Sequence, residues 1–150
     1  MTTYDPPRPW IASYASGVPE DLEPVSGSLV DIVAASAHDY PDAPALQFFG
    51  AETTYRRLQE DIDRAAAGLH ARGVGPGDTV AIVLPNCPQH IVAFYAVLRL
   101  GAVAVEHNPL YTPRELRKQF EDHGAKTAIV WSKAVRTVQD FPDDLRVTNR

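Results

Sequence analysis

The chain has 150 residues, of which 45% are hydrophobic and 22% charged, and its formal net charge is -5 at pH 7. This composition is typical of a globular protein of one ordinary domain. Nucleic-acid binders carry a basic face, whereas the pair Arg56–Arg57 is the nearest approach to a basic cluster here. The sequence therefore predicts no nucleic-acid partner.

The cysteine content and the apolar runs bear on where the protein resides. Cys87 is the single cysteine, which excludes an intrachain disulfide and a zinc site built on two or more thiolates. The N-terminus lacks the basic start and apolar run of a signal peptide. The longest apolar stretch, 91–105, is interrupted by Arg99 and is shorter than the ~18 apolar residues of a membrane span. We expect a cytoplasmic protein, with peripheral membrane contact and homo-oligomer formation left open.

The N-terminal region differs in composition from the rest. Residues 1–26 hold five of the 13 prolines and show no periodic pattern. They predict an extended arm, with Trp10 and Tyr14 as anchors onto the remainder of the chain, 27–150.

Two helices and a hairpin are expected next. Ser28 is placed to cap a helix that Pro41 ends, and Gly50 is the turn residue of a hairpin over 45–55. A second helix follows over 55–71. The apolar positions expected to face the core are Leu29, Ile32, Val33 and Ala37 in the first helix, and Leu58, Ile62, Ala65, Ala66 and Leu69 in the second.

From Thr79 onward, short apolar runs alternate with helical patterns, which predicts parallel strands joined by right-handed crossovers. The fold class is therefore α/β. We expect no helix to cover the last strand, so the chain has the pattern of an incomplete domain whose exposed apolar surface favours self-association. The predicted strands are 79–84, 102–106, 126–131 and 145–148, and the predicted helices are 88–100, 112–123 and 134–140.

Two patterns resemble known sites but lack their context. Gly73, Gly75 and Gly77 come before a strand and after a helix, the reverse of a phosphate-binding loop, and so predict a connector. Cys87 and His90 have a C-x-x-H spacing without a second ligand pair, so no metal site is predicted. Cys87 near a helix N-terminus leaves a thiolate nucleophile as a minor alternative, and His90 is expected to be a half-buried polar residue.

The loops after two predicted parallel strands are the best candidates for a ligand site. Asn86 follows the first strand, and His107 and Asn108 follow the second. Ligands of open α/β sheets bind outside the carboxyl ends of the strands, so these three residues are predicted to contact substrate. The alternative is structural, with Asn86 capping a helix and Asn108 shaping a turn. Trp131-Ser132-Lys133 is a weaker candidate at the same edge.

Several segments together resemble the adenylate-forming enzymes. The segment 108–116, Asn-Pro-Leu-Tyr-Thr-Pro-Arg-Glu-Leu, is especially similar to the branch of long-chain fatty acid–CoA ligases. The other segments of this resemblance are Trp10…Tyr14…Gly17-Val18-Pro19, Ser28-Leu29-Val30-Asp31, Thr53-Thr54-Tyr55-Arg56-Arg57-Leu58, Gly77-Asp78-Thr79-Val80-Ala81, Leu84-Pro85-Asn86 and Leu98-Arg99-Leu100-Gly101-Ala102.

This resemblance implies an enzyme that activates a carboxylic acid with MgATP to an acyl-adenylate and then transfers the acyl group to coenzyme A. The phosphate loop, the residues for ribose and magnesium, and the lysine of the C-terminal domain come later in that family than residue 150. The chain thus resembles the opening part of the large N-terminal domain, and we expect it to bind none of ATP, Mg²⁺ or coenzyme A alone and to be inactive. The alternatives are a non-catalytic interaction or oligomerisation module and, more weakly, a dinucleotide-binding oxidoreductase.

Overall fold

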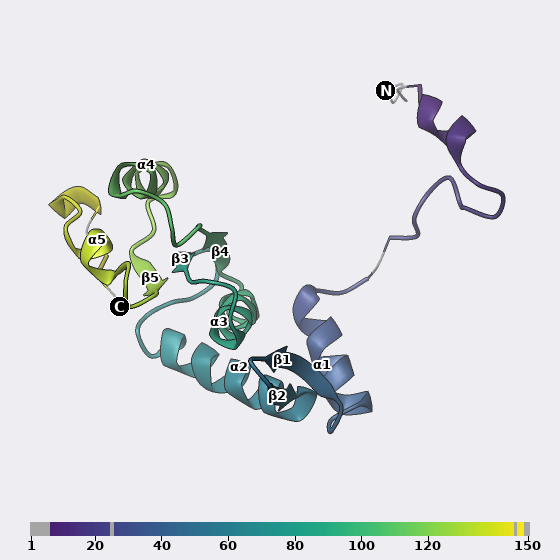
Figure 1. The fold of residues 1–150 in the computed structure, drawn as a ribbon, viewed down its shortest axis with the longest axis horizontal. Coiled ribbons are helices and arrows are strands. Elements are labelled where there is room, and N and C mark those ends of the chain that lie inside the picture. The colour runs from purple at the N-terminus through teal and green to yellow at the C-terminus, as the bar shows by residue number, and fades with distance from the viewer. Residues whose placement is uncertain (1–6, 25, 146, 149–150) are drawn as a thin grey trace.

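A three-stranded parallel sheet lies at the centre of the chain (Figure 1). The computed structural model describes residues 7–24, 26–145 and 147–148. The strand order is β4-β3-β5, so the first strand of the sheet in sequence lies between the other two. The bounds are Thr79–Val83 for β3, Val103–Glu106 for β4 and Thr127–Val130 for β5. This sheet, with its crossover helices α3 (Pro88–Arg99) and α4 (Pro113–His123), confirms the predicted α/β class.

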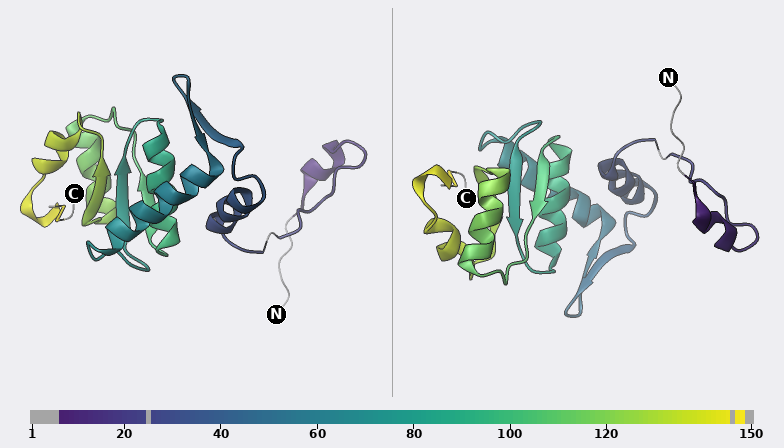
Figure 2. Two further views of the ribbon diagram at one scale, coloured as in Figure 1. Left: turned by 90° about the horizontal axis from the view of Figure 1, so that it is seen from below. Right: turned by 90° about the horizontal axis from the view of Figure 1, so that it is seen from above.

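Helices cover both faces of this sheet (Figure 2). Alternate residues of β3 belong to different apolar clusters, because successive side chains of a strand point to opposite faces. Val80 and Ile82 pack in the cluster that contains Val97 of α3. Ala81 and Val83 pack in the cluster that contains Phe120 of α4. The short helix α5 (Val135–Gln139) contributes Val138 to the second cluster.

The helix α1 (Leu29–Asp39) and a hairpin precede the sheet. Ser28 caps α1 as predicted, in a reciprocal box in which Ser28 N–H donates to the Asp31 carboxylate at 2.7 Å. The antiparallel strands β1 (Pro44–Phe48) and β2 (Ala51–Thr54) form the predicted hairpin, which projects from the sheet (Figure 2).

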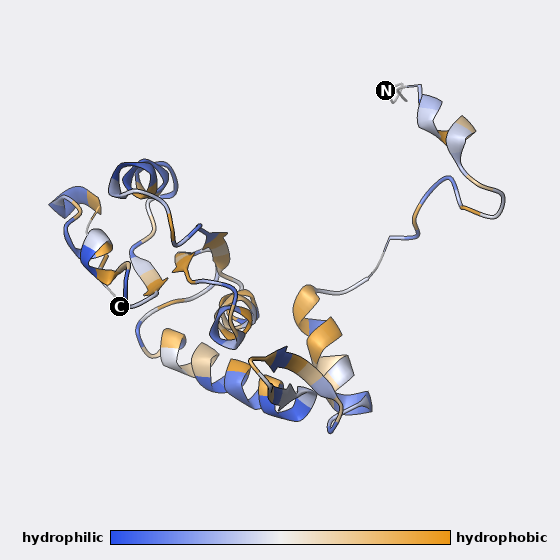
Figure 3. Cartoon of the chain, in the orientation of Figure 1, coloured by the Kyte–Doolittle hydropathy of each residue, from blue (hydrophilic) through white to orange (hydrophobic). Residues whose placement is uncertain are grey.

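The long helix α2 (Tyr55–His70) joins this region to the sheet layers. Its Leu58 and Ile62 form a third cluster with Val33 of α1. The apolar face predicted for α1 is buried only at Val33, since Leu29 and Ile32 are more than half exposed. Figure 3 shows the hydrophobic colour on much of this helix.

The N-terminal segment contains the short 3-10 helix η1 (Pro9–Ser13) and lies apart from the sheet layers (Figure 1). The expected anchoring by Trp10 and Tyr14 is wrong, because these side chains are 52% and 41% exposed. The segment closes on itself instead, through the ion pair between Arg8 and Asp21 at 2.7 Å. The boundary at residue 26 stays a prediction.

The end of the chain also departs from expectation. The predicted strand over 145–148 is wrong for the residues described there, because Leu145 ends the 3-10 turn η2 (Asp143–Leu145) that follows Pro142. Thr148 N–H donates to the carbonyl of Lys126 at 2.9 Å, without a strand ladder. Residue 146 lies outside the described residues. Nowhere in the described part of the chain is a helix both long and apolar enough to cross a membrane.

Candidate functional site

A hollow of about 470 Å³ lies at the carboxyl ends of the three parallel strands, and we call it the strand-end cleft. It contains all three residues predicted to contact substrate, Asn86, His107 and Asn108. The loops that follow β3 and β4 meet here because neighbouring parallel strands end at the same edge of the sheet. The lining residues are Leu84, Pro85, Asn86, His90, His107, Asn108, Pro109, Leu110 and Trp131.

The loop after β4 is held by a turn and a helix cap. The Asn108 side chain accepts a hydrogen bond from Leu110 N–H at 3.0 Å, so this residue shapes the turn as its structural interpretation predicted. Thr112 then caps α4, and its hydroxyl and backbone N–H contact the Glu115 carboxylate at 2.7 and 2.9 Å. These bonds lower the pKa of Glu115.

The structure contradicts the alternative that Asn86 caps a helix. The N-cap residue of α3 is Cys87, which makes no side-chain cap, so the interpretation of Asn86 as a helix cap is wrong. The Asn86 side chain is exposed at the mouth of the cleft. Cys87 is half-buried and borders a second hollow of about 530 Å³ with His90 and Glu106.

Two imidazole contacts hold the end of β4 to the helices on either face. Glu106 contacts His90, in the first turn of α3, and the His90 side chain is only 20% exposed, as predicted for a half-buried residue. His107 contacts His123, in the last turn of α4, with 2.9 Å between their Nε2 atoms. Glu106, the last residue of β4, and the adjacent His107 thus point to opposite faces and fix the start of the loop.

The electrostatics of the second contact favour uncharged rings. Burial, with a smaller effect from neighbouring His123, lowers the pKa of His107 to about 4. Burial also lowers the pKa of His123, against the opposing effect of the Asp122 carboxylate. Both imidazoles are therefore neutral at pH 7. No sequence signal pairs His123 with His107, since the two lie on different elements.

The cleft does not have the donor set of a triphosphate or magnesium site. Its lining residues include no lysine or arginine, and no group of three or more metal-ligating side chains occurs among the described residues. Lys133 lies nearby, with its Nζ 5.0 Å from the centre of the Trp131 ring.

The glycine-rich segment 73–78 lies at the other end of β3, where it acts as a connector. Gly77 N–H donates to the Gly101 carbonyl at 2.9 Å, and Gly75 N–H donates to the Asp78 carboxylate at 2.8 Å. These bonds tie the segment to the start of the sheet, in agreement with the prediction.

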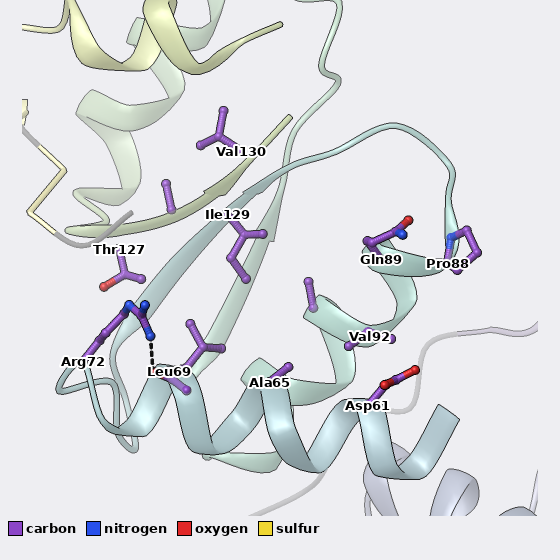
Figure 4. Close-up of a pocket in the computed structure, with 13 residues that line it drawn as sticks. Asp61, Ala65, Leu69, Arg72, Pro88, Gln89, Val92, Thr127, Ile129 and Val130 are labelled. Atoms are coloured by element: carbon purple, nitrogen blue, oxygen red, sulfur yellow. Dashed lines mark hydrogen bonds between the residues drawn. The ribbon is translucent and has the colours of Figure 1, made fainter. Parts of the chain in front are cut away.

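A third hollow, of about 710 Å³, is a groove between α2, α3 and β5 (Figure 4). Apolar side chains such as Leu69, Val92 and Ile129 line its middle. Asp61 and Arg72 lie at opposite ends, and the Arg72 guanidinium donates to the Gly68 carbonyl at 2.9 Å (Figure 4). Because apolar side chains line its middle, the groove has the character of a packing face rather than a reaction site.

Comparison with known proteins gives a consistent family. Residues 33–149 match the family model described as AMP-binding enzyme. The chain is 39% identical over 115 residues to a long-chain-fatty-acid–CoA ligase of Bacillus subtilis, covering 77% of the chain and 20% of that ligase. It is 37% identical over 137 residues to 4-coumarate–CoA ligase 2 of Oryza sativa, covering 88% of the chain and 24% of that ligase.

The structural comparison agrees. The N-terminal domain of FACL13 from Mycobacterium tuberculosis has a similar structure, with a TM-score of 0.73 and 26% identity over 80% of this chain and 32% of that one. The chain thus spans between a fifth and a third of the proteins it matches. Since the family model covers most of its length, the chain belongs to the AMP-binding enzyme family.

Proposed function

We propose that the chain is the N-terminal segment of a fatty acid–CoA ligase, which activates its acid with ATP to acyl-AMP and passes the acyl group to coenzyme A. The observation that carries this proposal is the 39% identity to a long-chain-fatty-acid–CoA ligase within the AMP-binding family. The similar rice protein is named for an aromatic acid, so an aromatic acid is the competing substrate class.

The segment serves as scaffold in this proposal, and its strand-end cleft lines part of the acyl or coenzyme A side of the site. Mg²⁺ and ATP are assigned to later parts of the polypeptide, since the cleft lining has neither carboxylates for the metal nor cationic residues for the phosphates. The 150-residue chain alone is therefore expected to be inactive.

ATP–pyrophosphate exchange over a panel of acids tests the proposal, on this chain and on the full gene product in parallel. We expect a silent 150-residue chain beside an active full product, with the strongest exchange for a long-chain acid. A preference for aromatic acids would replace the fatty acid. No measurable exchange by either protein would favour a non-catalytic interaction module.

Asn86 tests the role of the cleft, because its side chain is exposed and its removal leaves the buried core intact. In the full product, Asn86→Ala is expected to raise KM for the acid or for coenzyme A about 3- to 10-fold, the effect of one lost hydrogen bond. Gln59→Ala, on α2 outside the cleft, is the control. Unchanged kinetics in a folded Asn86→Ala protein would remove this residue from the site.

We also infer that the hairpin tip is the part of the chain best suited to peripheral membrane contact, because the Phe49 side chain is 95% exposed. Co-sedimentation of the chain with phosphatidylcholine vesicles tests this. Binding that Phe49→Asn abolishes would support it, and equal recovery of both proteins in the supernatant would contradict it.

A further inference from the structure

The hydrogen bond between His107 and His123 has a defined donor and a defined acceptor. The rings stack, with centroids 4.9 Å apart and an interplanar angle of 27°. The Phe120 ring lies against both, at centroid distances of 5.1 Å and 4.8 Å. His107 is only 6% exposed, so its ring nitrogens are largely removed from bulk solvent.

A backbone group fixes the position of each proton. Ala125 N–H donates to His123 Nδ1 at 3.0 Å, so this nitrogen carries a lone pair. A neutral His123 then has its proton on Nε2 and donates it to Nε2 of His107. His107 Nε2 is therefore an acceptor, and the proton of this neutral ring resides on Nδ1.

This arrangement leaves one donor without a partner. Among the described residues, His107 Nδ1 is a buried side-chain nitrogen with no hydrogen bond. A buried N–H that lacks an acceptor destabilises the folded state unless a water or a ligand satisfies it. His107 lines the strand-end cleft, together with the amide side chains of Asn86 and Asn108.

We propose that the strand-end cleft binds an uncharged carbonyl group, of an amide, ester or thioester, through His107 Nδ1–H, and that His123 is the positioning residue that keeps this proton on Nδ1. The carbonyl class follows from the lining. The cleft offers N–H donors and apolar walls but no lysine or arginine, and its other imidazole, His90, contacts Glu106. This proposal rests on the proposed function only in treating the cleft as a ligand site.

Histidine ¹⁵N spectra of the labelled 150-residue chain at pH 7.5 test the proton positions directly. We expect His107 in the Nδ1–H form and His123 in the Nε2–H form, whereas the exposed His70 provides an averaged reference. His123→Gln places an amide N–H near the position of Nε2 and should preserve the Nδ1–H form of His107. His123→Ala should lose it. A His107 ring with its proton on Nε2, or one that averages in the wild-type chain, overturns the proposal.

Titration with hexanamide, 1-hexanol and inorganic phosphate tests the ligand class. Hexanamide should shift the His107 Nδ1 resonance saturably, while 1-hexanol, which lacks the carbonyl, and phosphate should not. A response to phosphate, an equal response to 1-hexanol or none to hexanamide overturns the carbonyl assignment. This wild-type titration decides the matter even where a variant fails to fold.

Two variants separate the two nitrogens of His107. His107→Asn keeps an N–H donor near the position of Nδ1 and should retain hexanamide binding within about twofold, followed by the amide signals of Asn108 and Leu110. His107→Gln keeps only the Nε2 side and should bind about 3- to 10-fold more weakly, as for one lost hydrogen bond. The reverse order overturns the proposal. A full gene product without acid–CoA ligase activity would overturn the proposed function and leave these spectra unchanged.

Discussion

His107 links the stability of the fold to pH, because it is buried as a neutral imidazole whose pKa is about 4 rather than the ordinary 6.5. As pH falls below 6.5, the unfolded chain takes up a proton that the folded chain resists. The unfolding free energy therefore falls between pH 6.5 and about 4 and is unaffected by His107 above that range. Between pH 7.5 and 4.5 we expect this residue to account for a loss of about 2.5 kcal/mol.

Urea unfolding of the wild type and of His107→Leu at the two pH values measures this loss as the difference between their pH dependences. His70→Gln, at an exposed position near the end of α2, is the matched control and should retain the wild-type dependence. Equal dependences for the wild type and His107→Leu would show that His107 takes up a proton as readily in the folded chain as in the unfolded chain, which contradicts the prediction.

At the scale of single elements, the cap of α4 also fixes the end of the cleft loop. The Thr112 hydroxyl accepts a hydrogen bond from Glu115 N–H at 3.3 Å, and the Glu115 carboxylate bonds back to Thr112. Thr112→Ala removes the first of these bonds and is expected to lower the unfolding free energy by about 1 kcal/mol. Chemical denaturation monitored by circular dichroism measures the change. Lys118→Ala, on the exposed face of the same helix, should change it by less than about 0.5 kcal/mol.

The hairpin turn carries backbone strain at one residue. Phe49 has φ of 47° and Gly50 has φ of 82°, the signature of a type I′ turn that favours Asn or Gly at both positions. Phe49→Asn is expected to raise the unfolding free energy by about 0.5 kcal/mol, because Asn tolerates the left-handed region better than Phe. Phe49→Ala removes the same ring without this preference and should give no gain. Equal melting temperatures for the Asn and Ala variants would contradict the strain argument.

The elements that the sequence predicts well are those with local signals. A capping residue followed three positions later by an acidic residue predicts where a helix begins. This spacing occurs at Ser28 and Asp31 and again at Thr112 and Glu115. The apolar run of β3 shows a strand covered on both faces, and the parallel order then places Asn86, His107 and Asn108 at one edge.

The features that depend on distant partners were not predictable in the same way. His107 and His123 are 16 residues apart, and their contact depends on how α4 packs against the sheet. The apolar residues of the arm, such as Trp10, looked like anchors because composition shows their character but not their partner. Residues 143–145 form a tight turn, which ends at the residue where the predicted strand 145–148 begins.

At the scale of the whole molecule, the apolar groove between α2, α3 and β5 predicts association of the 150-residue chain with itself. Such surface is normally covered, and β5 also has an unpaired edge, since β3 is its one neighbour in the described sheet. Light scattering of the chain at increasing concentration should therefore show a rising mean mass.

Two lysine substitutions on α2 locate the association. Ala65→Lys places a charge in the groove and is expected to reduce the association at least threefold, because burying that charge in the contact is unfavourable. Ala67→Lys adds the same charge and length at an exposed position of the same helix and should leave it unchanged. If both variants associate like the wild type, the groove is not the surface responsible. If both weaken it equally, the cause is net charge rather than the groove.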